Sequence, residues 1–304
     1  MGMFAVVSAL DIDMSAIEPT GAEPVAEVCY RHSDRETGVT CQRCDRLVCG
    51  ECAAQASVGV HCPECRKSNK QKVYTARSLP GDEFYVTKAL VGLNVAVFVV
   101  TIVFFGATAT NIGREALEYS TFGPLIAEEF ELWRIISGGF LHDGLIHIGF
   151  NMYLLWRFGR ELEQKLGWKE YLATYMAALV GGSFGAVLIS PTTPVVGASG
   201  AVFGLMAVLV VLNRSRGIAL LDSNIGFLVL LNGFFSFRAG VSLGGHLGGF
   251  LVGLLLGAIF FGMNPGEGPI LGAGSKRLVL VVAIGLVLFG ATFAAATTWM
   301  SPLF

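Results

Sequence analysis

The chain has 304 residues, of which 53% are hydrophobic and only 14% charged, and its formal net charge is −2. A mean hydropathy of +0.63 is far above that of an ordinary soluble domain, which excludes a purely soluble protein. The basic residues are grouped beside apolar segments, which argues against a nucleic-acid-binding surface. We therefore interpret the chain as an integral membrane protein.

The amino-terminal part is polar and precedes every long apolar segment. Residues 1–28 are rich in Ala, Glu and Pro and have no basic n-region, so we predict a disordered tail and not a signal peptide. All seven cysteines follow directly, between Cys29 and Cys65. With one histidine they form four pairs of x2 spacing: Cys29 and His32, Cys41 and Cys44, Cys49 and Cys52, and Cys62 and Cys65.

Eight ligands in this pattern would fill two tetrahedral Zn²⁺ sites. Disulfides are the alternative, but an odd cysteine count and four identical spacings argue against them. His61 is an alternative ligand to Cys62. The short polar stretches within residues 29–66 build no core, so metal binding would supply most of the folding free energy there.

The spacing resembles a B-box-like or cross-brace zinc finger. This resemblance implies interleaved sites, with Cys29, His32, Cys49 and Cys52 on one ion and the other four ligands on the second. Sequential pairing stays open. With no free ligand position, the ions are expected to be structural. The finger is expected either to bind a cytoplasmic protein partner or to be merely a stable domain.

Seven apolar segments follow the basic linker 67–87, and each is predicted to form a helix. The second and fourth are short for a bilayer and are expected to be tilted or sunken. The first six would form a core at 88–262, followed by a Gly-rich loop at 263–277 and a seventh helix within 278–304. The segments are Ala89–Ala109, Leu145–Phe158, Tyr171–Ile189, Ala198–Leu212, Ile218–Phe237, Val241–Phe261 and Leu278–Thr297.

Positive charge predicts the orientation of these helices. Outside the finger, fourteen Lys and Arg residues lie at ends that would be cytoplasmic if the amino terminus is cytoplasmic. Only Arg114, Arg134 and Arg238 lie at the opposite ends. The positive-inside rule therefore places the finger in the cytoplasm and the carboxyl terminus outside. A reducing cytoplasm also suits thiolate ligands.

Four polar residues fall near the outer ends of three of these helices. Ser199 begins the fourth helix, His246 lies about one turn into the sixth, and His147 and Asn151 lie near the start of the second. Ionisable side chains at membrane depth are unfavourable and usually mark function. The ordinary alternatives are a helix cap for Ser199 and interhelical hydrogen bonds for the other three.

Small residues predict that the fourth and sixth helices pack closely. His246 shares a helix face with Gly249, Gly253 and Gly257, and the fourth helix carries Gly200 and Gly204. This packing would bring Ser199 to His246. Phe203, four residues after Ser199, would then lie against the imidazole.

His147 and Asn151 are four residues apart and therefore project from one helix face. Both can donate a hydrogen bond to a developing oxyanion. Neither Asp222, at the cytoplasmic end, nor Asp143, in an external loop, is placed to complete a triad. A Ser-His dyad is the simpler prediction.

From about Tyr85 to Phe261 the chain resembles the rhomboid family of intramembrane serine proteases. Gly197-x-Ser199-Gly200 is similar to its nucleophile motif, and His246-x-x-Gly249-x-x-x-Gly253 to its histidine helix. Trp133-Arg134, His142 and His147-x-x-x-Asn151 also stand where the family has its loop and oxyanion residues. Phe203 departs from the family, since many relatives carry tyrosine, and the zinc finger is an addition.

The resemblance implies an all-α polytopic protein with a six-helix catalytic core and one added carboxyl-terminal helix. It implies a serine endopeptidase that cleaves single-pass membrane proteins near the outer face through an acyl-enzyme. The oxyanion would be held by the Ser199 backbone N–H, His147 and Asn151, and catalysis would need no cofactor. The alternatives are an inactive rhomboid-like binder of membrane clients, or a zinc-finger scaffold. A transporter would need polar groups through the full membrane depth.

Overall fold

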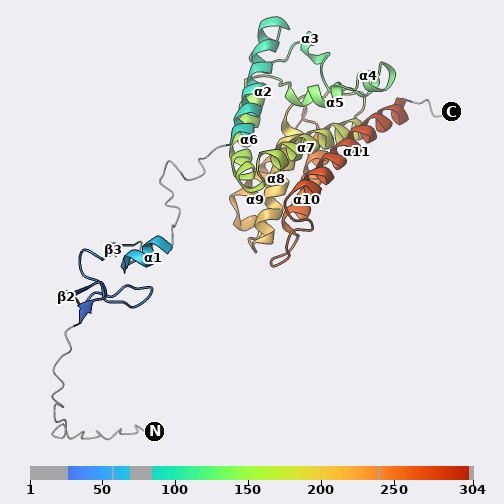
Figure 1. Cartoon of the computed structure of the whole chain (residues 1–304). Helices are drawn as coiled ribbons and strands as arrows, with labels where there is room; N and C mark the ends of the chain where they lie inside the picture. Colours follow the sequence, from blue (N-terminus) through green and yellow to red (C-terminus); the bar gives the residue numbers. More distant parts are fainter. Residues whose placement is uncertain (1–26, 57, 69–83, 239, 301–304) are drawn as a thin grey trace, which may run out of the picture. The chain divides into compact units, whose positions relative to one another are not determined.

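The computed structural model describes residues 27–56, 58–68, 84–238 and 240–300. The chain divides into two compact units, residues 1–79 and 80–304, which are treated separately below (Figure 1). Residues 1–26 of the predicted disordered tail and most of the basic linker lie outside the described residues, whereas Val28 of that tail belongs to a short strand.

The first unit is a small domain with little regular structure. Its strands are β1 (Val28–Cys29), β2 (His32–Glu36), β3 (Ala54–Gln55) and β4 (Val60–His61), and its helix is α1 (Pro63–Ser68). Strand β1 pairs antiparallel with β2, and β3 with β4. Val48 and five of the seven cysteines are buried in its interior. Because the core consists mainly of thiols, apolar burial alone cannot stabilise this unit.

The second unit contains one helix for each of the seven predicted apolar segments, which confirms the helical membrane fold. Four helices of the described residues are long and apolar enough to cross a membrane: α2, α7, α10 and α11. The seven are α2 (Tyr85–Phe104), α6 (Leu145–Leu166), α7 (Trp168–Ile189), α8 (Ser199–Ser215), α9 (Asn224–Phe235), α10 (Leu243–Phe261) and α11 (Ser275–Met300).

Two helices, α6 and α9, differ most in length from the prediction. α6 continues from the predicted end at Phe158 to Leu166, because charged residues end the apolar run without ending the helix. α9 has 12 residues where 20 were predicted. It starts only at Asn224, where the Ser223 hydroxyl accepts a hydrogen bond from the Gly226 N–H and caps the first turn. Before it lies only a short 3₁₀ turn, η3 (Leu220–Asp222).

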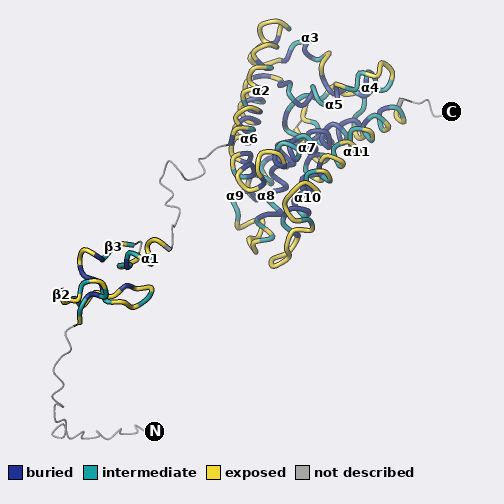
Figure 2. The backbone as a smooth tube through the Cα atoms, in the orientation of Figure 1, coloured by how far each residue is buried: buried dark blue, intermediate teal, exposed yellow. Residues whose placement is uncertain are grey.

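Helices α7, α8 and α10 form the centre of the second unit. Their tubes are mostly buried in Figure 2, whereas α2 and α11 are exposed along their outer faces. Glycines let the three backbones approach closely. A Cβ added to Gly249 would lie 1.9 Å from the Gly200 carbonyl oxygen, and one on Gly253 would lie 2.1 Å from that of Gly204. The predicted packing of the fourth helix on the sixth is confirmed.

Two buried carboxylates attach outer helices to this centre. Glu163 of α6 accepts hydrogen bonds from the N–H groups of Val86 and Thr87, at 2.9 and 2.8 Å, and so closes the amino terminus of α2. Glu170 of α7 forms a buried ion pair with Arg277 of α11. The charged ends of these helices therefore hold α2 and α11 in place.

The segment between α2 and α6 folds into short helices near the carboxyl-terminal ends of α2 and α11 (Figure 1). They are α3 (Arg114–Leu117), α4 (Gly123–Glu128), α5 (Arg134–Ser137) and η2 (Gly138–Phe140). The backbones of Thr121 and Val195 exchange two hydrogen bonds, of 3.0 and 2.9 Å. This segment therefore supports the loop that leads into α8.

Candidate functional site

Ser199 is the first residue of α8 and follows a loop whose path depends on a glycine. Gly197 has a φ of +124°, a conformation that L side chains rarely adopt, and its N–H donates to the Gly138 carbonyl at 2.9 Å. The chain turns here and presents Ser199 at the amino terminus of the helix. The N–H groups of this first turn have no acceptor within the helix. They are available to a negatively charged group.

His246 is the fourth residue of α10, a helix capped by the Ser242 hydroxyl. Its imidazole stacks on the Phe203 ring of α8, with the ring centroids 4.1 Å apart and the planes 15° from parallel. The predicted contact between these two rings is therefore present. Because Phe203 lies one turn after Ser199, and Gly249 contacts Gly200, His246 and Ser199 lie at the same end of the α8–α10 pair.

His147 approaches the same loop from α6. A Cβ placed on Gly197 would lie 2.7 Å from His147 Nε2 and 3.6 Å from Ser199 Oγ, so both groups border this glycine. The Asp143 backbone N–H donates to His147 Nδ1 at 3.3 Å. Since an imidazole nitrogen that accepts carries no proton, neutral His147 has its proton on Nε2. His147 therefore presents a donor beside Ser199.

Asn151, one turn further along α6, is 4% exposed. Its Nδ2 is among the buried side-chain nitrogens for which the described residues supply no hydrogen-bond partner. A buried donor without a partner costs about 1–3 kcal/mol, so such groups usually serve a ligand or a water. Asn151 is thus a donor without an acceptor, on the helix that also carries His147.

The three predicted supporting residues before α6, His142, Trp133 and Arg134, contact different parts of the structure. His142 is fully buried, and its Nε2 accepts a hydrogen bond of 3.5 Å from the N–H of Ala198, next to Ser199. Arg134 donates to the Ser120 carbonyl at 3.2 Å, and its guanidinium lies over the Trp133 ring. His142 therefore contacts the loop before α8, whereas Trp133 and Arg134 brace the preceding segment.

Sequence reasoning missed one neighbour of His246. Ser236, at the end of α9, has its Oγ 2.6 Å from His246 Nδ1. The available signal was a hydroxyl near the predicted outer end of a mostly apolar helix.

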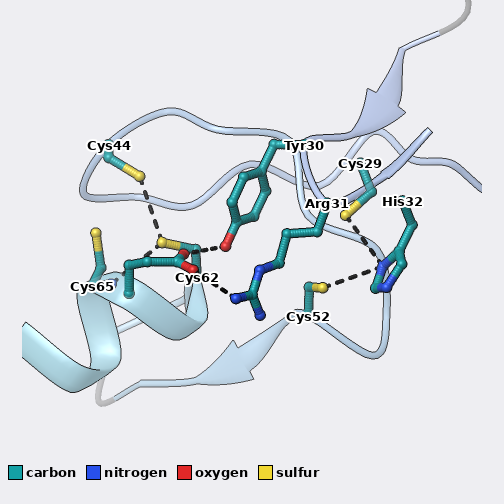
Figure 3. Close-up of polar contacts among 9 residues, drawn as sticks. Cys29, Tyr30, Arg31, His32, Cys44, Cys52, Cys62 and Cys65 are labelled. Carbon is teal, nitrogen blue, oxygen red and sulfur yellow. Dashed lines mark hydrogen bonds and ion pairs between the residues drawn. The ribbon is translucent and has the colours of Figure 1, made fainter.

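The first unit gathers its eight predicted ligands into two groups. Cys29, His32, Cys49 and Cys52 form one, and Cys41, Cys44, Cys62 and Cys65 form the other, with the ligand atoms of each group within 4.8 Å of one another. This is the interleaved arrangement, so sequential pairing is wrong. Cys62, not His61, belongs to the second group. Figure 3 shows members of both groups.

The distances within each group suit a tetrahedral ion. Zn–S bonds of about 2.3 Å and Zn–N bonds of about 2.0 Å require edges of roughly 3.8 Å between sulfurs and roughly 3.5 Å between sulfur and nitrogen. Cys44 Sγ lies 3.7 Å from Cys62 Sγ, and His32 Nδ1 lies 3.4 Å from the sulfurs of Cys49 and Cys52. Either group could hold a metal ion.

Local hydrogen bonds favour the thiolate form at one of these ligands. The pKa of the Cys49 thiol is lowered to about 7, mainly because the backbone N–H of Cys52 donates to its sulfur. Thiolates are the metal-binding form of cysteine, so this lowering suits a ligand.

Residues 129–263 match the family model of the rhomboid domain. This stretch of the chain is therefore similar to the rhomboid domain. The match runs from the end of α4 to just beyond α10 and includes Ser199, His246, His147 and Asn151. The first unit, α2 and α11 lie outside it.

Several curated proteins with related sequences are named as proteases. The chain is 30% identical over 169 residues to rhomboid protease GluP of Bacillus subtilis, which is 53% of this chain and 32% of that protein. It is 34% identical over 77 residues to rhomboid-like protease 3 of Toxoplasma gondii, covering 25% of this chain and 29% of the relative. It is 39% identical over 79 residues to the putative rhomboid protease YdcA of Bacillus subtilis, covering 26% and 40%. The chain thus matches less than half the length of each of these relatives, and the likeness concerns the rhomboid domain.

Proposed function

We propose that the rhomboid domain is an intramembrane serine endopeptidase with Ser199 as nucleophile and His246 as general base and acid. The observation that carries the proposal is the glycine-mediated contact of α8 with α10. It brings the start of α8 to the helix that carries His246, with Phe203 stacked on the imidazole. The names of the related proteins support the same reaction class.

In this mechanism Ser199 Oγ attacks the carbonyl carbon of the scissile peptide, and His246 takes the hydroxyl proton. The tetrahedral intermediate then breaks its C–N bond, and His246 passes the proton to the leaving amine. A serine ester of the substrate remains. Water, deprotonated by His246, attacks this ester and releases the second product and free Ser199.

Three donors are proposed to hold the oxyanion of each tetrahedral intermediate. The Ser199 N–H belongs to the first turn of α8 and has no acceptor within the helix. His147 Nε2 carries a proton because its Nδ1 accepts from Asp143. Asn151 Nδ2 is buried without a partner in the described structure. Donors already desolvated and oriented stabilise developing charge most effectively.

The substrate class proposed is a single-pass membrane protein, cut near the outer face of the bilayer. This orientation rests on the distribution of Lys and Arg. It puts the amino-terminal ends of α6, α8 and α10, and with them the site, on the outer side. A peptide bond inside a helix is shielded, so the substrate helix must unwind near the cut, and helix-breaking residues there should favour cleavage.

Replacing Asn151 by alanine tests the proposed peptidase and its oxyanion site together. With the full chain in liposomes and a tagged single-pass substrate, we expect kcat to fall by about 10²–10³-fold, because one oxyanion donor is lost. KM should change much less, since this interaction is made chiefly in the transition state. Fragment formation is measured on gels over a range of substrate concentrations.

A matched control is Asn232→Ala in α9, whose side-chain amide donates instead to the Leu228 carbonyl. It should lower kcat far less than Asn151→Ala. A change confined to KM in Asn151→Ala would assign Asn151 to substrate positioning. Failure of the parent chain to cleave any of a panel of single-pass substrates would favour the inactive client-binding alternative.

We propose further that the two ligand groups of residues 29–66 bind two structural Zn²⁺ ions. Each group supplies four ligands, which fill a tetrahedral shell and leave no position for a reacting water. The ions would hold together a domain whose interior is made mostly of thiols. They would take no part in peptide hydrolysis. We propose that this domain is cytoplasmic, followed by the core at 88–262, the loop at 263–277 and the seventh helix within 278–304.

Removing the metal should unfold the finger and leave the rhomboid domain active. Metal analysis of the purified chain is expected to give two zinc ions, one for each group. A strong chelator should remove both and make residues 29–66 sensitive to limited proteolysis. Cys49→Ser should lose one ion, whereas His61→Ala, which alters a histidine outside both groups, should keep two. Loss of peptidase activity on chelation, with the helices still folded, would contradict this separation of roles.

A further inference from the structure

The Ser236 hydroxyl makes two hydrogen bonds, and together they determine which atom is the donor in each. Ser236 follows the last residue of α9 and is 3% exposed. Its Oγ lies 2.6 Å from His246 Nδ1 and 2.8 Å from the Asn232 carbonyl oxygen, one helical turn earlier. A serine hydroxyl has a single proton but can accept as well as donate.

A carbonyl oxygen can only accept, so the hydroxyl proton must point to Asn232. Both contacts are then hydrogen bonds only if His246 Nδ1–H donates to Ser236 Oγ. In a neutral imidazole the proton on Nδ1 leaves Nε2 as the acceptor. The surroundings of His147 require the opposite tautomer, because there Nδ1 accepts from the Asp143 N–H.

The opposite tautomers match the different tasks of the two histidines. An oxyanion donor needs a proton on the nitrogen that faces the substrate, and a general base needs a lone pair there. Phe203 stacking restricts the plane of the His246 ring, and the bond to Ser236 determines its rotation within that plane. Serine can also accept from Nδ1–H when the ring becomes imidazolium in the reaction.

We propose that Ser236 is a positioning residue that keeps His246 as the Nδ1–H tautomer and directs Nε2 toward Ser199. It has the place that a carboxylate holds in a catalytic triad, but it is neutral and comes from a helix that carries no other proposed site residue. This inference rests on the proposed peptidase function. It explains how a dyad can orient its base where the hydrogen-bond partner of His246 Nδ1 in the described structure is a hydroxyl and not a carboxylate.

The test compares Ser236→Ala with Ser236→Thr in the full chain. In Ser236→Ala we expect kcat to fall about tenfold with little change in KM, because one net hydrogen bond to the base is lost. Ser236→Thr keeps the hydroxyl and should restore most of the loss. Ser215→Ala is the matched control, since its hydroxyl also bonds a carbonyl of its own helix, that of Leu212, at the opposite end of α8.

A spectroscopic measurement separates positioning from a merely structural effect. ¹⁵N NMR of histidine-labelled protein in detergent micelles should show His246 protonated on Nδ1, its signals identified by their loss in His246→Ala. In Ser236→Ala the population should shift toward the Nε2–H tautomer, while Ser215→Ala leaves it unchanged. A His246 tautomer that is the same with and without the Ser236 hydroxyl would overturn the inference, and so would an unaltered kcat in Ser236→Ala.

The NMR result does not depend on peptidase activity. If the parent chain shows no cleavage but the tautomer shifts as expected, the proposed reaction is wrong while the hydrogen bond is correctly assigned. If cleavage occurs but the His246 tautomer is the same in the parent and in Ser236→Ala, the proposed reaction is supported and the proposed role of Ser236 is wrong.

Discussion

Replacing Ser199 by alanine is expected to abolish cleavage of a single-pass membrane substrate, with a loss of more than about 10⁴-fold in kcat. Removing a nucleophile or its base from a serine peptidase typically costs this much or more, because the two act as a unit. His246→Ala should therefore lose about as much, and the double variant little more than either alone. The measurement is fragment formation on gels with equal amounts of purified chain in liposomes.

A fluorophosphonate probe gives an independent check, since it labels only an activated serine. The parent should be labelled, and both single variants should not. Ser215→Ala is the control for the substitution itself, because Ser215 is the last residue of the same helix of which Ser199 is the first. It should keep both labelling and cleavage. Cleaved fragment persisting in Ser199→Ala would rule out Ser199 as the nucleophile.

The second large effect is expected from adding one methyl group to Gly249. An alanine Cβ there would lie 1.9 Å from the Gly200 carbonyl oxygen and 2.6 Å from its carbon, and neither can move without shifting the backbone of α8. Overpacking of this kind costs about 1–3 kcal/mol or more. Because the contact lies beside Ser199 and His246, we expect Gly249→Ala to lower the melting temperature clearly and to abolish probe labelling.

The control is the same substitution at glycines of other membrane helices, where an added Cβ would have no close neighbour. A Cβ on Gly92 in α2 or on Gly290 in α11 has no atom within 4 Å of those counted. Alanine there also has the better helix propensity, by about 1 kcal/mol. Thermal unfolding in detergent and probe labelling should both be unchanged or improved. Equal behaviour of Gly249→Ala and Gly290→Ala would show that the close approach of α8 and α10 is not required.

Much of the architecture was predictable because it depends on local pattern. A run of apolar residues indicates a membrane helix whatever it packs against, and all seven runs became helices. Glycines repeated on one face indicate a close helix contact, which the neighbours of Gly249 and Gly253 confirm. The stack of Phe203 on His246 followed from that contact, since one helical turn separates Phe203 from Ser199.

The predicted helix ends were wrong where the apolar run and the helix do not cover the same residues. In α6 the charged turn after Phe158 still has good helix formers, so the helix continues to Leu166. Before α9, the apolar residues Ile218–Leu221 led to the prediction of a longer helix. There the Gly217 φ of +78° and the Ser223 cap delay its start until Asn224.

The sequence alone was enough to predict a membrane bundle, two sets of four metal ligands, and four polar residues for one end of that bundle. Each of these is recorded in spacing and composition within short windows. Only the tertiary structure decided which neighbour each polar group has. The Asp143 N–H donates to His147, Ser236 contacts His246, and Asn151 Nδ2 has no hydrogen-bond partner among the described residues. These contacts depend on loop conformation and on the exact end of a helix, and a single hydroxyl or backbone N–H leaves no periodic signal in the chain. The direction of each hydrogen bond, and hence which histidine nitrogen is free to take a proton, is therefore a property of the fold.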